Sequence, residues 1–270
     1  IINVPVGANI RDILYECGVM DNNKYIIVGG PMMGRYYPIK ETNNLFVKKT
    51  TGALIVIDDK HYLVSKRNIN YNKIKALAKS SCIQCSFCSD LCPRNLLGHK
   101  INPHLVMRSV GFANMDNIVD NSEHILDKLK ESYFCCECGI CEYYSCPMGI
   151  NPANMNIYMK SLLRKENIKP DKDSKNTGIN KFIEYRRVST DRLISKLELD
   201  KYSHTNFNID NPIKIDINKV TIMLSQHIGM PAEPIVKEGD FVEVGQMIGK
   251  VPFDKVGANI HASINGIVEN

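Results

Sequence analysis

The sequence predicts an α+β chain that is divided into several small domains. Its 270 residues, 44% of them hydrophobic, are enough for two or three compact cores. Short β-type runs gather near both ends of the chain, whereas apolar residues at helical spacing and most of the cysteines lie between them. These observations indicate a helical region flanked by two β-containing regions.

Residues 1–64 are expected to form a small domain with one helix packed on a mixed sheet. The helix is predicted over residues 10–18, where apolar residues recur at helical spacing and Gly18 closes the pattern. Cys17 lies in this helix and is interpreted as a small buried hydrophobic residue. The expected strands are residues 25–28, 45–47 and 53–57.

A glycine-rich loop at residues 29–34 follows the first of these strands. Its glycines allow unusual backbone angles, and Met32 and Met33 offer a soft apolar surface. The loop does not have the helix and the downstream acidic residue that complete a dinucleotide-binding fingerprint. We therefore interpret it as a turn and not as a nucleotide site.

Eight of the ten cysteines fall into two runs within residues 65–165, which are expected to form a helical domain. The runs are Cys82, Cys85, Cys88 and Cys92, and Cys135, Cys138, Cys141 and Cys146. A proline follows the last cysteine of each run, and the first run has the spacing of bacterial two-cluster ferredoxins. The pattern predicts two [4Fe–4S] clusters and an electron-transfer chemistry in which no residue acts as a catalytic acid or base.

In ferredoxins of this type, the fourth cysteine of each run binds the cluster that the other run holds. The first cluster is therefore expected on Cys82, Cys85, Cys88 and Cys146, and the second cluster on Cys135, Cys138, Cys141 and Cys92. Cys136 is interpreted as a non-ligand, because only Cys135 has the correct spacing to Cys138. Cys17 is isolated in the sequence and is interpreted in the same way.

Zinc and disulfide bonds are the alternatives for so many cysteines. Structural zinc sites use two separated C-x2-C pairs, so a third cysteine at the same tight spacing favours a cluster. A zinc-stabilised structural module, or a cofactor-binding module, stays open as a hypothesis. Disulfide bonds need an oxidising compartment, and neither a signal peptide nor an apolar stretch of membrane-spanning length is seen. We expect a cytoplasmic protein with metal-bound thiolates and no direct membrane span.

Further helices are expected around the cysteines, and they are predicted to bury the clusters. They cover residues 102–108, residues 122–129 with Ser122 as N-cap, and residues 151–163 with Pro152 in the first turn. The candidate residues of a dry apolar shell are Ile83, Phe87, Leu91, Phe134, Ile140 and Tyr144. His99, His104 and His124 are interpreted as packing or surface residues.

Residues 166–212 are polar and are expected to form a linker with an amphipathic helix at residues 190–197. Residues 213–270 are expected to form a small all-β barrel or sandwich, with β-type runs at 220–224, 239–246 and 257–268. Lys255 lies where lipoyl domains carry their modified lysine. We interpret Lys255 as an unmodified lysine of a hairpin, with attachment of a swinging arm as the alternative.

The formal net charge of +5 is spread along the chain, without a basic cluster interleaved with aromatic residues. Such a distribution is typical of a solvated surface. Nucleic acid is therefore not expected as a partner.

The order of these segments resembles the RnfC-like family. Residues 4–7, 28–34 and 49–54 are similar to the soluble-ligand-binding β-grasp (SLBB) domain of that family. Residues 224–232 and 257–266 are similar to its barrel-sandwich hybrid module. The resemblance implies a β-grasp domain at 1–64, a two-cluster ferredoxin-like domain at 65–165, a linker at 166–212 and a barrel-sandwich domain at 213–270.

The order of the modules implies a subfamily. In the C subunit of Rnf complexes the barrel-sandwich module stands at the N-terminus, whereas here it follows the clusters. This order, together with the four residues between Cys141 and Cys146, is similar to the cobalamin reductases of propanediol-utilisation microcompartments. The alternative is the C subunit of an Rnf-type, membrane-associated and ion-translocating complex.

The resemblance also implies cofactors and partners. Relatives carry FMN and NADH in a domain that precedes the β-grasp domain, so these residues are expected to be the electron-transfer part of a longer oxidoreductase. The barrel is likewise expected to end before its last strand. A corrinoid or a corrinoid-handling protein is the implied electron acceptor, and a microcompartment shell protein is a further implied partner.

Overall fold

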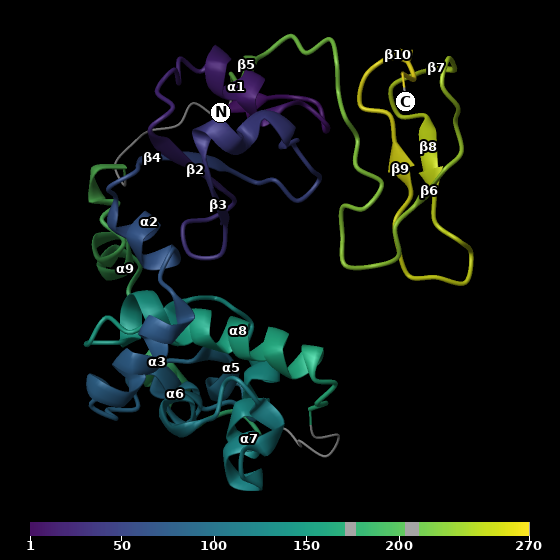
Figure 1. Cartoon of the computed structure of the whole chain (residues 1–270). Coiled ribbons are helices and arrows are strands. Elements are labelled where there is room, and N and C mark those ends of the chain that lie inside the picture. The colour runs from purple at the N-terminus through teal and green to yellow at the C-terminus, as the bar shows by residue number, and fades with distance from the viewer. Residues whose placement is uncertain (171–176, 203–210, 270) are drawn as a thin grey trace. The chain divides into compact units, whose positions relative to one another are not determined.

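The computed structural model describes residues 1–170, 177–202 and 211–269 and divides the chain into two compact units (Figure 1). One unit contains residues 1–30, residues 34–59 and the described residues after 210. The other contains residues 31–33 and the described residues from 60 to 202. The cysteine runs lie in this second unit, which we call the helical unit.

The N-terminal part of the first unit is one helix on an antiparallel sheet. Helix α1 (Ile10–Glu16) begins at Asn9, whose side chain accepts a hydrogen bond from the backbone N–H of Arg11 at 2.7 Å. Its apolar face buries Ile10 and Leu14 against the sheet. The strands are β2 (Lys24–Val28), β3 (Arg35–Pro38) and β4 (Leu54–Asp58), in the order β3-β2-β4.

Several expectations for this part were wrong. The sheet is not mixed, because β2 pairs antiparallel with both neighbours. Residues 45–47 form no strand, and Phe46 makes only an isolated bridge with Asn9. The 3-10 helix η1 (Ile39–Asn44) precedes them. Cys17 is exposed, because it caps α1 beyond the face that carries the buried residues.

The C-terminal part of the first unit is made of short strands. Strands β6 (Glu233–Pro234), β8 (Met247–Lys250) and β9 (Ile260–His261) form one sheet in the order β6-β8-β9. Strand β7 (Phe241–Val242) pairs with β10 (Gly266–Ile267), and β1 (Ile2–Asn3) pairs in parallel with β5 (Ile213–Lys214). Residues 220–224 form no strand, although Ile222 and Leu224 pack on the core of Ala232, Val251 and Ile260.

The helical unit is built from short helices and single turns. Its α-helices are α2 (Tyr62–Arg67), α3 (Tyr71–Ser80), α4 (Phe87–Asp90), α5 (Pro93–Leu96), α6 (Pro103–Phe112), α7 (Glu123–Lys130), α8 (Pro152–Lys165) and α9 (Thr190–Lys196). Its 3-10 helices are η2 (Ile118–Asp120), η3 (Glu131–Phe134), η5 (Ile183–Arg186) and η6 (Asp200–Tyr202), and η4 (Cys141–Ser145) is a π-helix. Helices α6, α7 and α8 confirm the helices expected at residues 102–108, 122–129 and 151–163, and α9 confirms the amphipathic helix at 190–197. Ser122 stands at the N-cap position, but its side chain makes no capping hydrogen bond.

The core of the helical unit lies where α3, α6 and α8 meet. Ile74 comes from α3, Met107 from α6, and Met155 and Met159 from α8, and each of these side chains is at most 2% exposed. Leu129 of α7 closes the same cluster. Tight burial of these long side chains fixes the positions of the helices to which the cysteine loops are attached.

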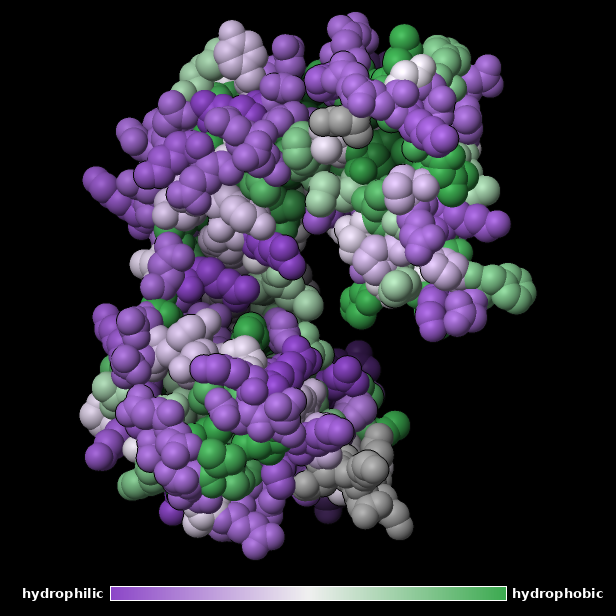
Figure 2. All heavy atoms as spheres, turned by 45° about the vertical axis from the view of Figure 1, so that its right-hand side comes forward, coloured by the Kyte–Doolittle hydropathy of each residue, from purple (hydrophilic) through white to green (hydrophobic). Residues whose placement is uncertain are grey.

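Hydrophilic side chains cover most of the face of the molecule that Figure 2 shows, with smaller hydrophobic areas between them. None of the helices in the described part of the chain combines the length and the hydrophobicity that crossing a membrane requires.

Candidate metal centre

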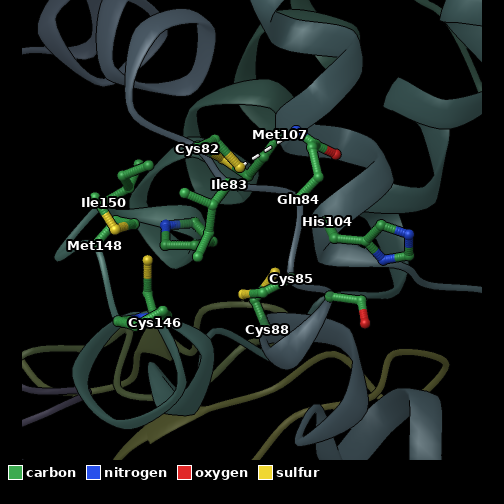
Figure 3. Close-up of a pocket in the computed structure, with 13 residues that line it drawn as sticks. Cys82, Ile83, Gln84, Cys85, Cys88, His104, Met107, Cys146, Met148 and Ile150 are labelled. Carbon is green, nitrogen blue, oxygen red and sulfur yellow. Dashed lines mark hydrogen bonds between the residues drawn. The ribbon is translucent and has the colours of Figure 1, made fainter.

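Cysteines from both runs line one pocket of the helical unit. They are Cys82, Cys85, Cys88 and Cys146. Figure 3 shows Cys85, Cys88 and Cys146 with their sulfur atoms facing a shared space, and Cys82 beyond them. The remaining walls are mostly apolar and include Met107, Met148 and Ile150. The structure therefore brings the last cysteine of the second run to the first run.

The remaining cysteines gather in a second group. The pKa of Cys135 is raised to about 11, mainly by burial and also by the neighbouring thiols of Cys92 and Cys136. Burial likewise raises the pKa of Cys138 to about 12, with Cys136 and Cys92 again among the causes. The buried thiol of Cys141 has Cys135, Glu142 and Cys92 as its main electrostatic neighbours, followed by Cys88 of the first group. The last cysteine of the first run is thus placed with the second run.

The two loops share an unusual backbone pattern. In the first loop, Gln84 and Ser86 have φ values of 54° and 61°, and in the second loop, Glu137 and Gly139 have 62° and 79°. These are the same positions relative to the first cysteine of each run. Non-glycine residues rarely adopt positive φ, and alternating backbone conformations of this kind turn successive N–H groups towards one concave site. Such concavities bind anions, including iron–sulfur clusters.

Hydrogen-bond donors already point at sulfur in both loops. The backbone N–H of Glu137 donates to Sγ of Cys135 at 3.3 Å, and Nε2 of Gln84 donates to Sγ of Cys82 at 3.3 Å. The second of these bonds is drawn in Figure 3. Hydrogen bonds to cluster sulfur are one of the means by which proteins set cluster potentials.

The electrostatics of the thiols fit a cationic group. The pKa of Cys88 is raised to about 12, first by burial and then by the neighbouring thiols of Cys146, Cys82 and Cys85. Buried thiols at this spacing cannot all ionise unless cations compensate for their charge, because each thiolate raises the pKa of the others. A metal bound to such thiols deprotonates them outright. The donor set therefore fits a [4Fe–4S] cluster at each group of cysteines.

A single metal ion requires its thiolate ligands to lie closer together than the ligands of a [4Fe–4S] cluster do. Thiolates around one zinc ion all lie about 2.3 Å from the same point, whereas thiolates around a cubane bind different irons and lie further apart. In residues 1–170, 177–202 and 211–269, no three His, Cys, Asp or Glu side chains are grouped closely enough to hold one metal ion.

A buried carboxylate anchors the segment that runs from Cys141 of one group to Cys146 of the other. Glu142 follows Cys141 in η4, and it accepts hydrogen bonds from the backbone N–H of Asn154 at 2.9 Å and from Nδ2 of Asn151 at 3.1 Å. Burial raises the pKa of Glu142, while the Asn154 amide and the Lys66 ammonium act in the opposite direction. Because Cys146 directly follows η4, this carboxylate holds a segment with one cysteine of each group against the start of α8.

The sequence interpretation missed Glu142 and also Lys160, which contacts the second loop. Both are polar residues whose side chains are buried. An acidic residue inside a cysteine run, and a lysine among the apolar residues of a predicted helix, were the available signals.

The predicted apolar shell is only partly present. Leu91, Phe134, Ile140 and Tyr144 are half-buried, whereas Ile83 is 62% exposed and Phe87 is 50% exposed. The prediction was wrong for Phe87, which does not line the pocket, whereas Ile83 lines the pocket of the first group even though most of its side chain is exposed. The first site is therefore the one that lies under an exposed loop.

The histidines have packing or surface roles, as the sequence predicts. Nδ1 of His104 lies 2.7 Å from Oγ of Ser89, and Nε2 of His99 lies 2.9 Å from Nη1 of Arg94. His124 is exposed. Cys136, which was expected to be a non-ligand, is half-buried and lies beside Cys138.

Comparisons with known families agree with these two sites and with the order of the segments. A 4Fe-4S dicluster domain matches residues 81–151. The RnfC barrel sandwich hybrid domain matches residues 183–270, after the cysteines. The chain is RnfC-like. The matched barrel-sandwich segment begins well before residue 213, where the sequence places the start of this domain.

Curated relatives extend the comparison. This RnfC-like chain is 36% identical to "Cobalamin reductase PduS" of Citrobacter freundii over 275 residues, which cover 99% of the chain and 56% of that protein. It is also 36% identical to "Cobalamin reductase PduS" of Salmonella typhimurium strain LT2, over 99% of the chain and 56% of that protein. The chain thus spans a little more than half the length of these relatives.

A more distant relative belongs to an ion-translocating oxidoreductase complex. The chain is 26% identical to the C subunit of that complex from Buchnera aphidicola over 157 residues, which cover 58% of the chain and 27% of that protein. No solved structure matches the chain.

Proposed function

We propose that this chain is the iron–sulfur electron-transfer portion of an oxidoreductase, and that its cysteines hold two [4Fe–4S] clusters with exchanged fourth ligands. The observation that carries the proposal is the pocket in which Cys146 joins Cys82, Cys85 and Cys88. Two complete thiolate sets in one small helical unit provide two redox centres close together. The match to a dicluster domain over residues 81–151 supports the same chemistry.

The clusters, when bound, would accept and release single electrons. The chain itself would bind them through the thiolates, donate hydrogen bonds to sulfur from Glu137 and Gln84, and exclude water around the half-buried and buried cysteines. No side chain is required to transfer a proton. The function of these residues is therefore to position the two redox centres and to tune their potentials.

The whole protein is proposed to be an NADH-dependent cobalamin reductase. The support is the 36% identity, over 99% of this chain, to cobalamin reductase PduS. On this proposal FMN and NADH bind in a domain outside residues 1–270, and the acceptor is a corrinoid or a protein that handles one. A location inside a microcompartment, with a shell protein as a partner, belongs to the same proposal.

Residues 1–64 are proposed to form an SLBB-like β-grasp domain. The support is the single helix α1 over the antiparallel sheet β3-β2-β4. Residues 65–165 and 213–270 are proposed as the cluster-binding and barrel-sandwich domains. Lys255 is exposed and pairs with Asp254 at 3.0 Å, and we propose that it is unmodified.

Metal analysis tests the central proposal. Anaerobically purified protein should contain about eight iron and about eight sulfide per chain and should lose its visible colour when dithionite is added. A colourless protein with about two zinc ions per chain would contradict the proposal and favour the structural zinc module. The chain of residues 1–270 should neither bind FMN nor oxidise NADH by itself.

The full-length protein separates the two related activities. A cobalamin reductase should reduce cob(III)alamin with NADH much faster than it reduces ferredoxin. The opposite preference would favour the role of the Rnf complex subunit. Either outcome leaves the assignment of the clusters intact.

A further inference from the structure

One buried lysine contacts the loop of the second cysteine group. Lys160 lies on α8 and is only 8% exposed. Its ammonium donates to the backbone carbonyl oxygen of Cys135 at 2.5 Å and to Oε1 of Glu137 at 2.7 Å. A lysine is rarely buried unless it is paired, so the geometry indicates that this ammonium has a specific role.

Glu137 is the partner of this ammonium and lies within the cysteine run. Its φ of 62° is in the left-handed region, and its backbone N–H donates to Sγ of Cys135 at 3.3 Å. Its carboxylate is 44% exposed and pairs with Lys160. A negative charge is thereby held beside the second group of cysteines, and a positive charge compensates for it.

The first loop has no such charge at the equivalent position. Gln84 corresponds to Glu137, with a φ of 54°, and its neutral amide donates directly to Sγ of Cys82. The two loops therefore have a similar backbone but different charges. The difference lies in one carboxylate and in the lysine that neutralises it.

The sign of the effect follows from the charge that reduction adds. Reduction brings one negative charge to a cluster, so a nearby carboxylate disfavours it and a nearby ammonium favours it. With both present, the two contributions largely cancel. Removal of either partner alone leaves an uncompensated charge next to the cluster.

We propose that Lys160 is the counter-ion of Glu137 and that its charge compensates for the carboxylate, which would otherwise make the reduction potential of the second cluster more negative. Lys160 is not a ligand, and it acts on the cluster through its charge. The inference rests on the proposed function, because it requires a cluster on Cys135, Cys138, Cys141 and Cys92. It adds to that function a lysine that neutralises a carboxylate beside one cluster and has no counterpart in the loop of the other.

The test is a set of charge variants of the intact chain, each titrated anaerobically while the EPR signals of both clusters are followed. Lys160→Met should shift the potential of the second cluster to more negative values. Glu137→Gln should shift it to more positive values, because the ammonium is then uncompensated. The double variant should return close to the wild-type potential.

Two controls isolate the charge effect. Lys165→Met removes the same charge from an exposed position near the end of α8, and it should leave both potentials unchanged. The first cluster provides a reference within each variant, since its shift should be the smaller one. Iron and sulfide contents, measured on every variant, show whether both clusters are assembled.

Three results would overturn the inference. The first is equal potentials in wild type, Lys160→Met and Glu137→Gln with both clusters assembled. The second is a shift of both single variants in the same direction. The third is a double variant that stays as negative as Lys160→Met, which would show that the bond to the Cys135 carbonyl matters and the charge does not.

The inference and the proposed function can fail separately. If wild-type protein assembles no clusters, the proposed function fails. If clusters assemble but their potentials ignore these charges, only the role of Lys160 is rejected. If Lys160→Met fails to fold, Glu137→Gln still decides, because its side chain is partly exposed and its expected shift has the opposite sign.

Discussion

Replacing Cys92 tests whether the fourth ligands are exchanged between the two cysteine runs. Cys92 follows the first run in sequence, but its thiol is an electrostatic neighbour of Cys135, Cys138 and Cys141. Cys92→Ser should therefore damage the second cluster and spare the first. Since one [4Fe–4S] cluster of two depends on this thiol, the iron content should fall from about eight to about four per chain.

Alkylation of the native protein can locate the lost cluster. Under anaerobic conditions, iodoacetamide should modify only cysteines that no longer bind iron, and mass spectrometry identifies them. In Cys92→Ser the modified residues should include Cys135 and Cys138. Cys146→Ser should give the mirror result, with modification of Cys82 and Cys85 and again about four iron per chain.

Two controls accompany this experiment. Cys17→Ser changes an exposed thiol outside both groups and should keep about eight iron per chain. Cys136 lies beside Cys138, so the double variant Cys92→Ser/Cys136→Ser excludes replacement of one thiol by the other. If Cys92→Ser exposes Cys82 and Cys85 instead, each run closes its own site, and the reasoning from the shared pocket is wrong.

Two further predictions concern stability. Leu129→Ala removes a fully buried side chain from the core of the helical unit and should lower the free energy of unfolding by about 2–5 kcal/mol. Chemical denaturation measures this change. The control Leu97→Ala, at a 45% exposed position, should change the free energy of unfolding by less than about 0.5 kcal/mol. Burial lowers the pKa of His104, while Asp90 and Glu131 act to raise it and Arg108 acts to lower it. The unfolded state therefore takes up a proton before the folded state does as the pH falls below about 6.5, so the free energy of unfolding should decrease there. In His104→Gln the free energy of unfolding should depend less on pH between about pH 7 and about pH 5.5 than it does in the wild type. Equal slopes in wild type and variant would show that His104 does not cause this pH dependence.

Local pattern predicted the helices well and the strands less well. Residues 103–112, 123–130 and 152–165 are helical as expected, because their apolar spacing is regular and Pro begins two of them. The run at 220–224 packs on a β-core without forming a strand. Strands in this part have as few as two residues, so their pairing depends on distant partners that a local pattern does not contain.

The local sequence pattern also did not predict which apolar side chains are exposed to solvent. Cys17, Ile83 and Phe87 are apolar or weakly polar, and the sequence interpretation buried all three. The structure exposes them: Cys17 caps α1, Ile83 lies in the first cysteine loop, and Phe87 begins the short helix α4. Hydrophobic character permits burial but does not determine it.

The sequence by itself determined the chemistry of the site. Three cysteines at x2 spacing constrain a loop of seven residues, and the type of metal group that such a loop fits follows from its covalent geometry. The tertiary structure decided what lies around that loop. Only the packing of α3, α6 and α8 brings Cys146 to the first run, places Glu142 under the start of α8 and brings Lys160 to the carbonyl of Cys135. These contacts join residues that are distant in the chain, and their positions depend on the shared core that the helices bury and not on any short segment.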